Sequence, residues 1–238
     1  MTFTLSNPKN NKQMFATDLD DTLYREIDFV ISGYHAIGHE LEVHDVMSEK
    51  EVVNILKSAE DTWHGIDNLA THIWMNHPDS KFSVEWMLSI YRNHRPAINL
   101  CDGARETLGS IVDAGHKIGI ITDGRSSTQR AKIEALGLLD FVMPENIIIS
   151  EEVGGDKTTR IPFEKLISRN PDEKRFVYLG DNPAKDFRWP NALGWTTVEL
   201  KDTDGRNIHS QSIDVPEDFK AQYVIRNFRD ILTVTNKM

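Results

Sequence analysis

The stretch QMFATDLDDT (13–22) joins a short apolar run to three closely spaced carboxylates, Asp18, Asp20 and Asp21. The run has the length and composition of a buried strand. Like charges this close repel one another unless a cation holds them or the stretch is a solvated turn. Ligands of parallel sheets collect at the carboxyl ends of the strands. The residues at the ends of the other predicted strands therefore decide between the two interpretations.

Composition narrows the class of protein. The chain has 238 residues, 39% of them hydrophobic, which fits one large domain or one domain carrying a smaller insert. Its single cysteine, Cys101, excludes an internal disulfide and suits a reducing cytoplasm, where we expect the protein to work. No apolar run reaches the ~18 residues of a membrane span, and the first residues lack the apolar core of a secretory signal.

The charge balance is acidic, with a net charge of −10 from 37 acidic and 27 basic residues. Non-specific binding to nucleic acid needs a basic surface that displaces counterions, so we expect no nucleic-acid partner. A small anionic substrate is compatible with this charge, provided that a bound cation offsets the local carboxylates. Nothing in the sequence indicates an oligomeric state.

Most of the chain alternates between two patterns. Apolar runs rich in Ile, Val and Phe recur at 13–19, 117–123, 146–150, 175–181, 195–200 and 222–225. Helical periodicity occupies the stretches 104–115, 126–137, 161–170 and 227–235. Strands that alternate with helices predict an α/β fold with a Rossmann-like parallel sheet covered on both faces.

Residues 24–100 differ, because they carry hardly any strand pattern. Apolar residues recur there every three or four positions, which predicts helices over 27–42, 48–66, 67–77 and 83–94. We therefore expect an α/β core made of residues 1–23 and 101–238, interrupted after its first strand by a helical insert over 24–100.

Polar residues stand at the ends of the predicted strands in turn: Asp18 and Asp20, then Thr122, Asp123 and Gly124, then Lys157, and finally Asp181 with Asp186. Several carboxylates around one point need a divalent cation, and all-oxygen ligation suits Mg²⁺. A lysine, a hydroxyl and backbone N–H groups can hold the oxygens of a phosphate. A carboxylate beside Mg²⁺ can attack phosphorus, and a second one two residues on can transfer the proton.

The pattern resembles the haloacid dehalogenase superfamily in its phosphatase branch. The motifs are DLDDT (18–22), Thr122, Lys157 and GDNPAKD (180–186), in the order and at the spacings of that family. The resemblance implies that the insert is a C1-type helical cap. It further implies a Mg²⁺-dependent phosphomonoester hydrolase that acts on a small metabolite, such as a sugar phosphate or nucleoside monophosphate, through an aspartyl-phosphate.

The resemblance also assigns roles to residues. Asp18 would be the nucleophile and a metal ligand. Asp20 would be the general acid and base, with its backbone carbonyl as a second ligand. Asp181 would complete the metal site, and Asp186 would bond to metal-bound water or to Lys157. The phosphoryl group would be held by Thr122, with Asp123 and Gly124 beside it, and by Lys157.

Two positions depart from the family pattern. The lysine segment reads KTTRIPF (157–163), where many relatives read KPDPxIF, so neither proline stands at its family position, although the spacing from lysine to phenylalanine is kept. Asp21 replaces a glycine found in many relatives, and we assign it no catalytic role.

Two alternatives stay open. A phosphomutase of the β-phosphoglucomutase type keeps every core residue and differs in its cap. A catalytically silent binding module of the same fold would be expected to lack Asp18, Asp20, Lys157 or Asp181, and all four are present.

Overall fold

The computed structural model describes residues 12–78, 81–205, 207–211 and 213–235. The chain forms two compact units. One contains the chain up to Glu26 and from Asn99 onward, and the other is Ile27–Ile98. Each unit has its own hydrophobic core.

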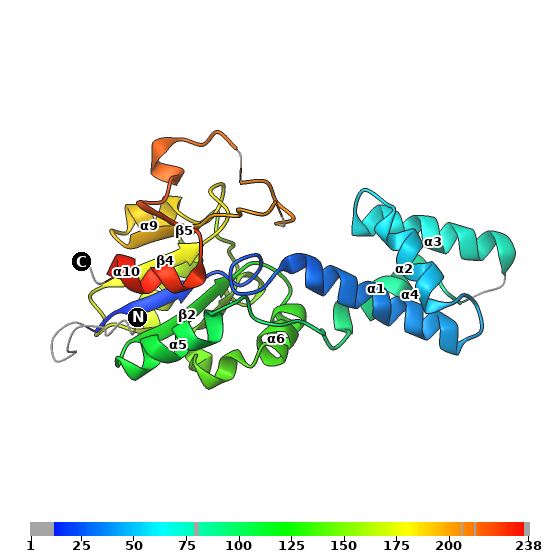
Figure 1. Cartoon of the computed structure of the whole chain (residues 1–238), viewed down its shortest axis with the longest axis horizontal. Helices are drawn as coiled ribbons and strands as arrows, with labels where there is room; N and C mark the ends of the chain where they lie inside the picture. Colours follow the sequence, from blue (N-terminus) through cyan, green and yellow to red (C-terminus); the bar gives the residue numbers. More distant parts are fainter. Residues whose placement is uncertain (1–11, 79–80, 206, 212, 236–238) are drawn as a thin grey trace. The chain divides into compact units, whose positions relative to one another are not determined.

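The first unit is built on a parallel sheet (Figure 1). Within the described residues it has six strands in the order β3-β2-β1-β4-β5-β6. The strands are β1 (Met14–Thr17), β2 (Lys117–Thr122), β3 (Ile147–Ile149), β4 (Phe176–Gly180), β5 (Thr196–Leu200) and β6 (Tyr223–Ile225). Each lies within a predicted run, and every pairing is parallel. The predicted α/β fold class is confirmed.

Helices cover both faces of this sheet (Figure 1). Phe15 and Thr17 of β1 face an apolar layer with Leu108 and Ile231, from α5 (Ala104–Asp113) and α10 (Ile231–Thr235). Met14 and Ala16 point the other way and share a core cluster with residues of α8 (Ile161–Arg169). The remaining helices of the unit are α6 (Ser126–Ala135), α7 (Ser150–Val153) and α9 (Arg188–Ala192).

The strand order reverses at β1. The chain moves outward from β1 to β2 and β3, then returns to β4 on the other side of β1. Loops that leave β1 and β4 at their carboxyl ends therefore run apart, and the crevice between them is the place where open parallel sheets bind ligands. Asp18 and Asp181 come directly after these two strands.

The second unit is helical in all its regular elements within the described residues. It contains most of α1 (Glu26–Val43), together with α2 (Glu49–Lys57), α3 (Thr62–Asn76) and α4 (Val84–Asn93). The division predicted between 66 and 67 was wrong: the break falls at 58–61, where the Asp61 carboxylate accepts a hydrogen bond from His64 N (2.9 Å) and starts α3. Such a cap satisfies a free N–H of the first turn. No helix among the described residues is long and apolar enough to cross a membrane.

Candidate active site

Three buried aspartates meet at the carboxyl ends of β1 and β4. A carboxylate oxygen from each of Asp18, Asp181 and Asp186 lies within 4.8 Å of the others. Neighbouring strands bring them together, since Thr17 is in register with Leu179. No other group of three acidic, histidine or cysteine side chains in the described part of the chain has its ligand atoms so close.

Lys157 inserts its ammonium group into this cluster. Its Nζ lies 2.8 Å from Asp18 Oδ1 and 2.7 Å from Asp186 Oδ1, and the residue is only 4% exposed. Asp186 Oδ2 also accepts hydrogen bonds from the backbone N–H groups of Asp181 (3.1 Å) and Asn182 (2.8 Å). Asp186 thus orients both the lysine and the turn that carries Asp181.

Two hydrogen bonds hold the loop that carries Lys157. Lys157 N donates to Asp123 Oδ1 at 3.0 Å, which ties the loop to the end of β2. Trp189 Nε1 donates to the carbonyl oxygen of Thr158 at 2.7 Å, from α9. These two bonds fix the backbone on either side of the side chain, so the loop keeps Lys157 against Asp18 by hydrogen bonding.

Asp20 has separate partners. Its Oδ1 pairs with Lys132 Nζ at 2.7 Å and accepts a short hydrogen bond from the Tyr24 hydroxyl. Its Oδ2 accepts from Gln129 Nε2 at 2.8 Å. Sequence reasoning missed these three partners. Gln129 and Lys132 are polar residues three apart that are buried in α6 together with Ile133, and this helical spacing was the available signal.

The predicted phosphate-binding residues are only partly together. Thr122 is buried at the end of β2, and its hydroxyl accepts from Gln129 Nε2 at 2.5 Å. Asp123 and Lys157 line the same cavity. The structure does not bring in Gly124, which is absent from the cavity lining and whose N–H donates to Ser150 Oγ at 2.9 Å.

The cavity extends beyond the predicted set. It is lined by Asp18, Asp20, Thr122, Asp123, Lys157 and Asp181, and in addition by Asp21, Glu26, Asn182, Lys185 and His209. Its wall is therefore strongly polar, with carboxylates in excess of cations. A small anion can enter such a cavity only where a cation compensates the carboxylates.

The acidic cluster holds more negative charge than Lys157 can balance. Burial raises the pKa of Asp181 to about 9, and the neighbouring Asp186 and Asp18 add to the effect. Burial likewise raises the pKa of Asp18 to about 8, against the opposing charge of Lys157. Oxygens that would otherwise take up protons near neutral pH form the donor set that a hard divalent cation prefers. The residues present therefore fit Mg²⁺.

Asp20 has the opposite electrostatic environment. Burial acts to raise its pKa, but the charge of Lys132 and the hydrogen bonds from Lys132, Tyr24 and Gln129 outweigh it and lower the pKa. At Lys157, burial acts to lower the pKa, and the charges of Asp18 and Asp186 hold it well above its usual value. Asp20 is therefore an ionised carboxylate with its own cation, and Lys157 stays protonated.

Comparisons with known proteins identify the family of this chain. The family described as haloacid dehalogenase-like hydrolase matches residues 16–199. Glyceraldehyde 3-phosphate phosphatase of Methanocaldococcus jannaschii is 25% identical over 93% of this chain and 96% of its own. Pyrimidine 5'-nucleotidase YjjG of Escherichia coli is 39% identical over 34% of this chain and 36% of its own.

A solved structure agrees in fold. The putative hydrolase YfnB of Bacillus subtilis, in a magnesium-bound crystal form, aligns over 95% of this chain and 100% of its own. The TM-score is 0.62 at 18% sequence identity. Since the family match spans most of the chain and includes every predicted strand end up to β5, the chain belongs to the haloacid dehalogenase-like hydrolases.

Proposed function

We propose that the protein is a Mg²⁺-dependent phosphatase that hydrolyses small phosphate monoesters through an aspartyl-phosphate on Asp18. The observation that carries the proposal is the contact of Lys157 Nζ with Asp18 Oδ1 at 2.8 Å, inside a cluster of three carboxylates. A nucleophile, a fixed positive charge and a metal-binding oxygen set thus share one cavity.

Asp18 would attack phosphorus with the carboxylate oxygen that faces the cavity. Its partner Lys157 fixes the side chain and supplies a positive charge that attracts the phosphoryl oxygens. The Thr122 hydroxyl, at the end of β2, would donate to another phosphoryl oxygen. These groups are preorganised by burial, so little reorganisation is needed when the substrate arrives.

Asp20 would move the proton. It lies two residues from Asp18 at the turn after β1, so both carboxylates can face one substrate. Because the carboxylate is ionised in the resting protein, it would first take up a proton from solvent and then give that proton to the leaving oxygen. In the second step it would take a proton from the attacking water. Its low pKa favours the second of these roles in the resting protein.

Asp18, Asp181 and the Asp20 carbonyl would hold Mg²⁺, with Asp186 supporting Asp181 through the backbone. Bound Mg²⁺ would offset the carboxylate charge and polarise the phosphoryl group. The raised pKa values of Asp18 and Asp181 support this assignment, because these oxygens compete for a positive charge at neutral pH.

The proposed substrate class rests on the relatives and on the helical unit. The Methanocaldococcus jannaschii relative, alignable over almost its whole length, is a phosphatase of a triose phosphate, and the Escherichia coli relative is a nucleotidase. We propose that the unit Ile27–Ile98 is a cap that selects a small metabolite and excludes water during transfer. Triose phosphates, sugar phosphates and nucleoside monophosphates are the candidates.

The test is hydrolysis of p-nitrophenyl phosphate and of a panel of these metabolites, with Mg²⁺ or with EDTA. We expect activity that needs Mg²⁺ and that Asp18→Asn abolishes. Activity that survives EDTA or Asp18→Asn would overturn the mechanism. Transient accumulation of a bisphosphate from a sugar 1-phosphate would instead identify a phosphomutase.

A further inference from the structure

The segment between β5 and β6 reaches back to the acidic cluster. Asn207 Nδ2 donates to Asp181 Oδ2 at 2.8 Å, and Gln211 Nε2 donates to the Asp181 carbonyl oxygen at 2.8 Å. One side chain thus fixes the carboxylate of Asp181 and the other fixes its backbone. The segment lies in the orange part of the chain in Figure 1, and the family motifs do not include it.

Internal hydrogen bonds brace this segment. Asp202 Oδ2 accepts from Asn207 N at 3.0 Å, and Asp202 N donates to Gln211 Oε1 at 2.7 Å. Gln211 Nε2 also donates to the carbonyl oxygen of Leu200, the last residue of β5, at 2.8 Å. Hydrogen bonds thus connect Asn207 to the end of β5 through Asp202 and Gln211, and they fix the position of its side-chain amide.

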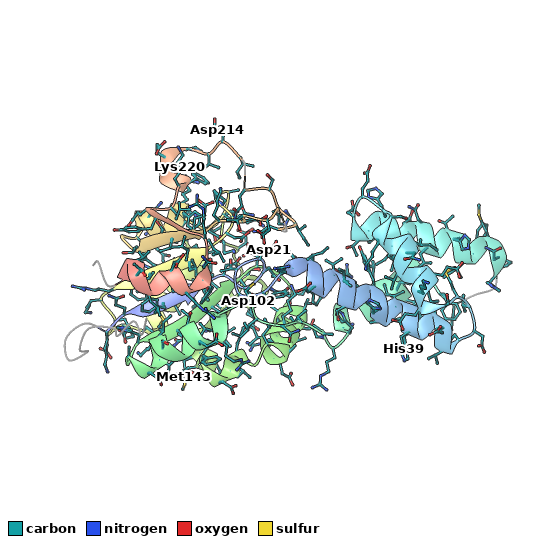
Figure 2. All side chains as sticks on the ribbon, viewed as in Figure 1. Asp21, His39, Asp102, Met143, Asp214 and Lys220 are labelled. Carbon is teal, nitrogen blue, oxygen red and sulfur yellow. The ribbon has the colours of Figure 1, made fainter. Side chains whose placement is uncertain are left out.

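A second anchor joins the segment to the first motif. Ile208 N donates to Asp21 Oδ2 at 2.9 Å, while Asp21 Oδ1 accepts from Glu26 N at 2.9 Å. Asp21, labelled in Figure 2, has a φ of 53°, in the left-handed region that favours glycine. A glycine would adopt this conformation without strain but has no carboxylate. The aspartate is thus strained in its backbone, but its carboxylate makes two hydrogen bonds that a glycine could not make. One of these bonds holds Ile208.

We propose that Asn207 is a positioning residue for the cation-binding carboxylate of Asp181, and that Asn207 and Gln211 of the β5–β6 connection belong to the metal site. This inference rests on the proposed Mg²⁺ site. The amide is a neutral donor, so it fixes the rotamer of Asp181 without the positive charge that would compete with a cation. Groups that orient a ligating carboxylate in this way typically contribute 10- to 100-fold to metal affinity.

A merely structural role leads to a different expectation. If Asn207 only closed the β5–β6 connection, its removal would lower the stability of the metal-free protein and leave the affinity for Mg²⁺ unchanged. A positioning role lowers the affinity for Mg²⁺ and changes the metal-free stability little, because the segment keeps its Asp202, Gln211 and Asp21 anchors.

The affinity for Mg²⁺ is measured by isothermal titration calorimetry of the whole chain. The stability of the metal-free protein is measured by thermal unfolding in EDTA. Asn207→Leu keeps the size of the side chain and removes the donor, and Asn207→Ser, too short to reach Asp181, replaces it should the leucine variant fail to fold. Thr203→Ala is the matched control, since the Thr203 hydroxyl bonds to neighbouring Asp204 and does not touch Asp181.

We expect the affinity of Asn207→Leu for Mg²⁺ to fall about tenfold, with Thr203→Ala binding as the wild type does. Wild-type affinity in the Asn207 variants would overturn the inference, as would an equal loss in Thr203→Ala or a wild-type protein that binds no Mg²⁺. Failure of the proposed function is recognised separately: a wild type that binds Mg²⁺ through Asn207 and hydrolyses no phosphate ester would retain the positioning role and lose the phosphatase.

Discussion

Asp18 and Asp20 are two residues apart on one strand end, yet they belong to opposite electrostatic environments. Asp18 shares a single lysine with Asp186 and lies near Asp181, and its pKa is raised to about 8. Asp20 has Lys132 as its ion-pair partner, with two further hydrogen-bond donors, and its pKa is lowered. One carboxylate is short of positive charge and the other is not.

This difference shows where a divalent cation is needed. Around Asp18 the carboxylates exceed the lysine, so either protons or a metal must supply the missing charge. Around Asp20 the charge is already balanced, which leaves that carboxylate for proton transfer. Environments that push the pKa values of paired carboxylates apart are a recurrent way to give them different roles. Four experiments test this division.

The largest effect is expected for Asp20→Asn, measured on two substrates whose leaving groups differ in their need for a proton. Asp20→Asn should lower the rate of phosphoryl transfer from alkyl phosphates to Asp18 by about 10²- to 10⁴-fold, because their leaving oxygen needs a proton. The loss of this first-step rate on p-nitrophenyl phosphate should be much smaller, since nitrophenolate leaves unprotonated. Asp18→Asn should abolish the hydrolysis of both, and single-turnover kinetics on the two substrates measures the contrast in the first step. Equal losses of the first-step rate for Asp20→Asn on both would show that Asp20 does not protonate the leaving oxygen.

Lys157→Met should test whether the carboxylates around Asp18 carry more negative charge than the protein balances. Breaking a buried ion pair from one side costs about 3 kcal/mol or more of unfolding free energy. The cost should be larger at pH 9, where Asp18 is mostly ionised and Asp181 partly so, and smaller at pH 6, where both carboxyl groups carry protons. Urea denaturation in EDTA at the two pH values provides the measurement, with the exposed Lys165→Met as control. A cost that does not change with pH would contradict the charge argument.

The metal-free protein should lose stability as pH rises. The pKa values of Asp18 and Asp181, about 8 and about 9 in the folded protein, exceed their ordinary value of 3.8. Between pH 3.8 and the raised pKa of each group, the folded state therefore binds more protons than the unfolded state. Because of this difference, the free energy of unfolding falls over that pH range by up to about 1 kcal/mol per pH unit and group. Thermal unfolding in EDTA from pH 6 to 9 measures it, and stabilisation by Mg²⁺ should grow over the same range. A protein equally stable from pH 6 to 9 would refute the expectation.

Lys132→Met should produce the smallest change, a shift of a pH profile. Without the lysine charge the pKa of Asp20 rises, so the limb of the activity profile that belongs to Asp20 should move to higher pH by about one unit. The measurement is the pH dependence of kcat/KM for an alkyl phosphate. An unmoved profile would show that Lys132 only packs against Tyr24.

Much of the site could be predicted from sequence because parallel strands impose a simple geometry. Asp18, Thr122 and Asp181 stand directly at the ends of β1, β2 and β4, and adjacent parallel strands bring such positions to one edge. The helix boundaries near 58–61 were predicted less well, because the cap at Asp61 is a local hydrogen bond in a stretch whose apolar period hardly changes. The hydrogen bond from Gly124 N to Ser150 was not foreseen for a related reason, since Ser150 comes from the end of the neighbouring strand β3.

The sequence alone determined the α/β fold, the family motifs and the strand ends that carry Asp18 and Asp181, because these depend on short-range patterns and on strand order. Only the tertiary structure decided which hydrogen-bond donor contacts each carboxylate. Lys132 is 112 positions from Asp20, and Asn207 is 26 positions from Asp181. Neither pairing leaves a local pattern in the sequence, because a hydrogen bond between distant segments requires only that the folded backbone bring one donor to one acceptor.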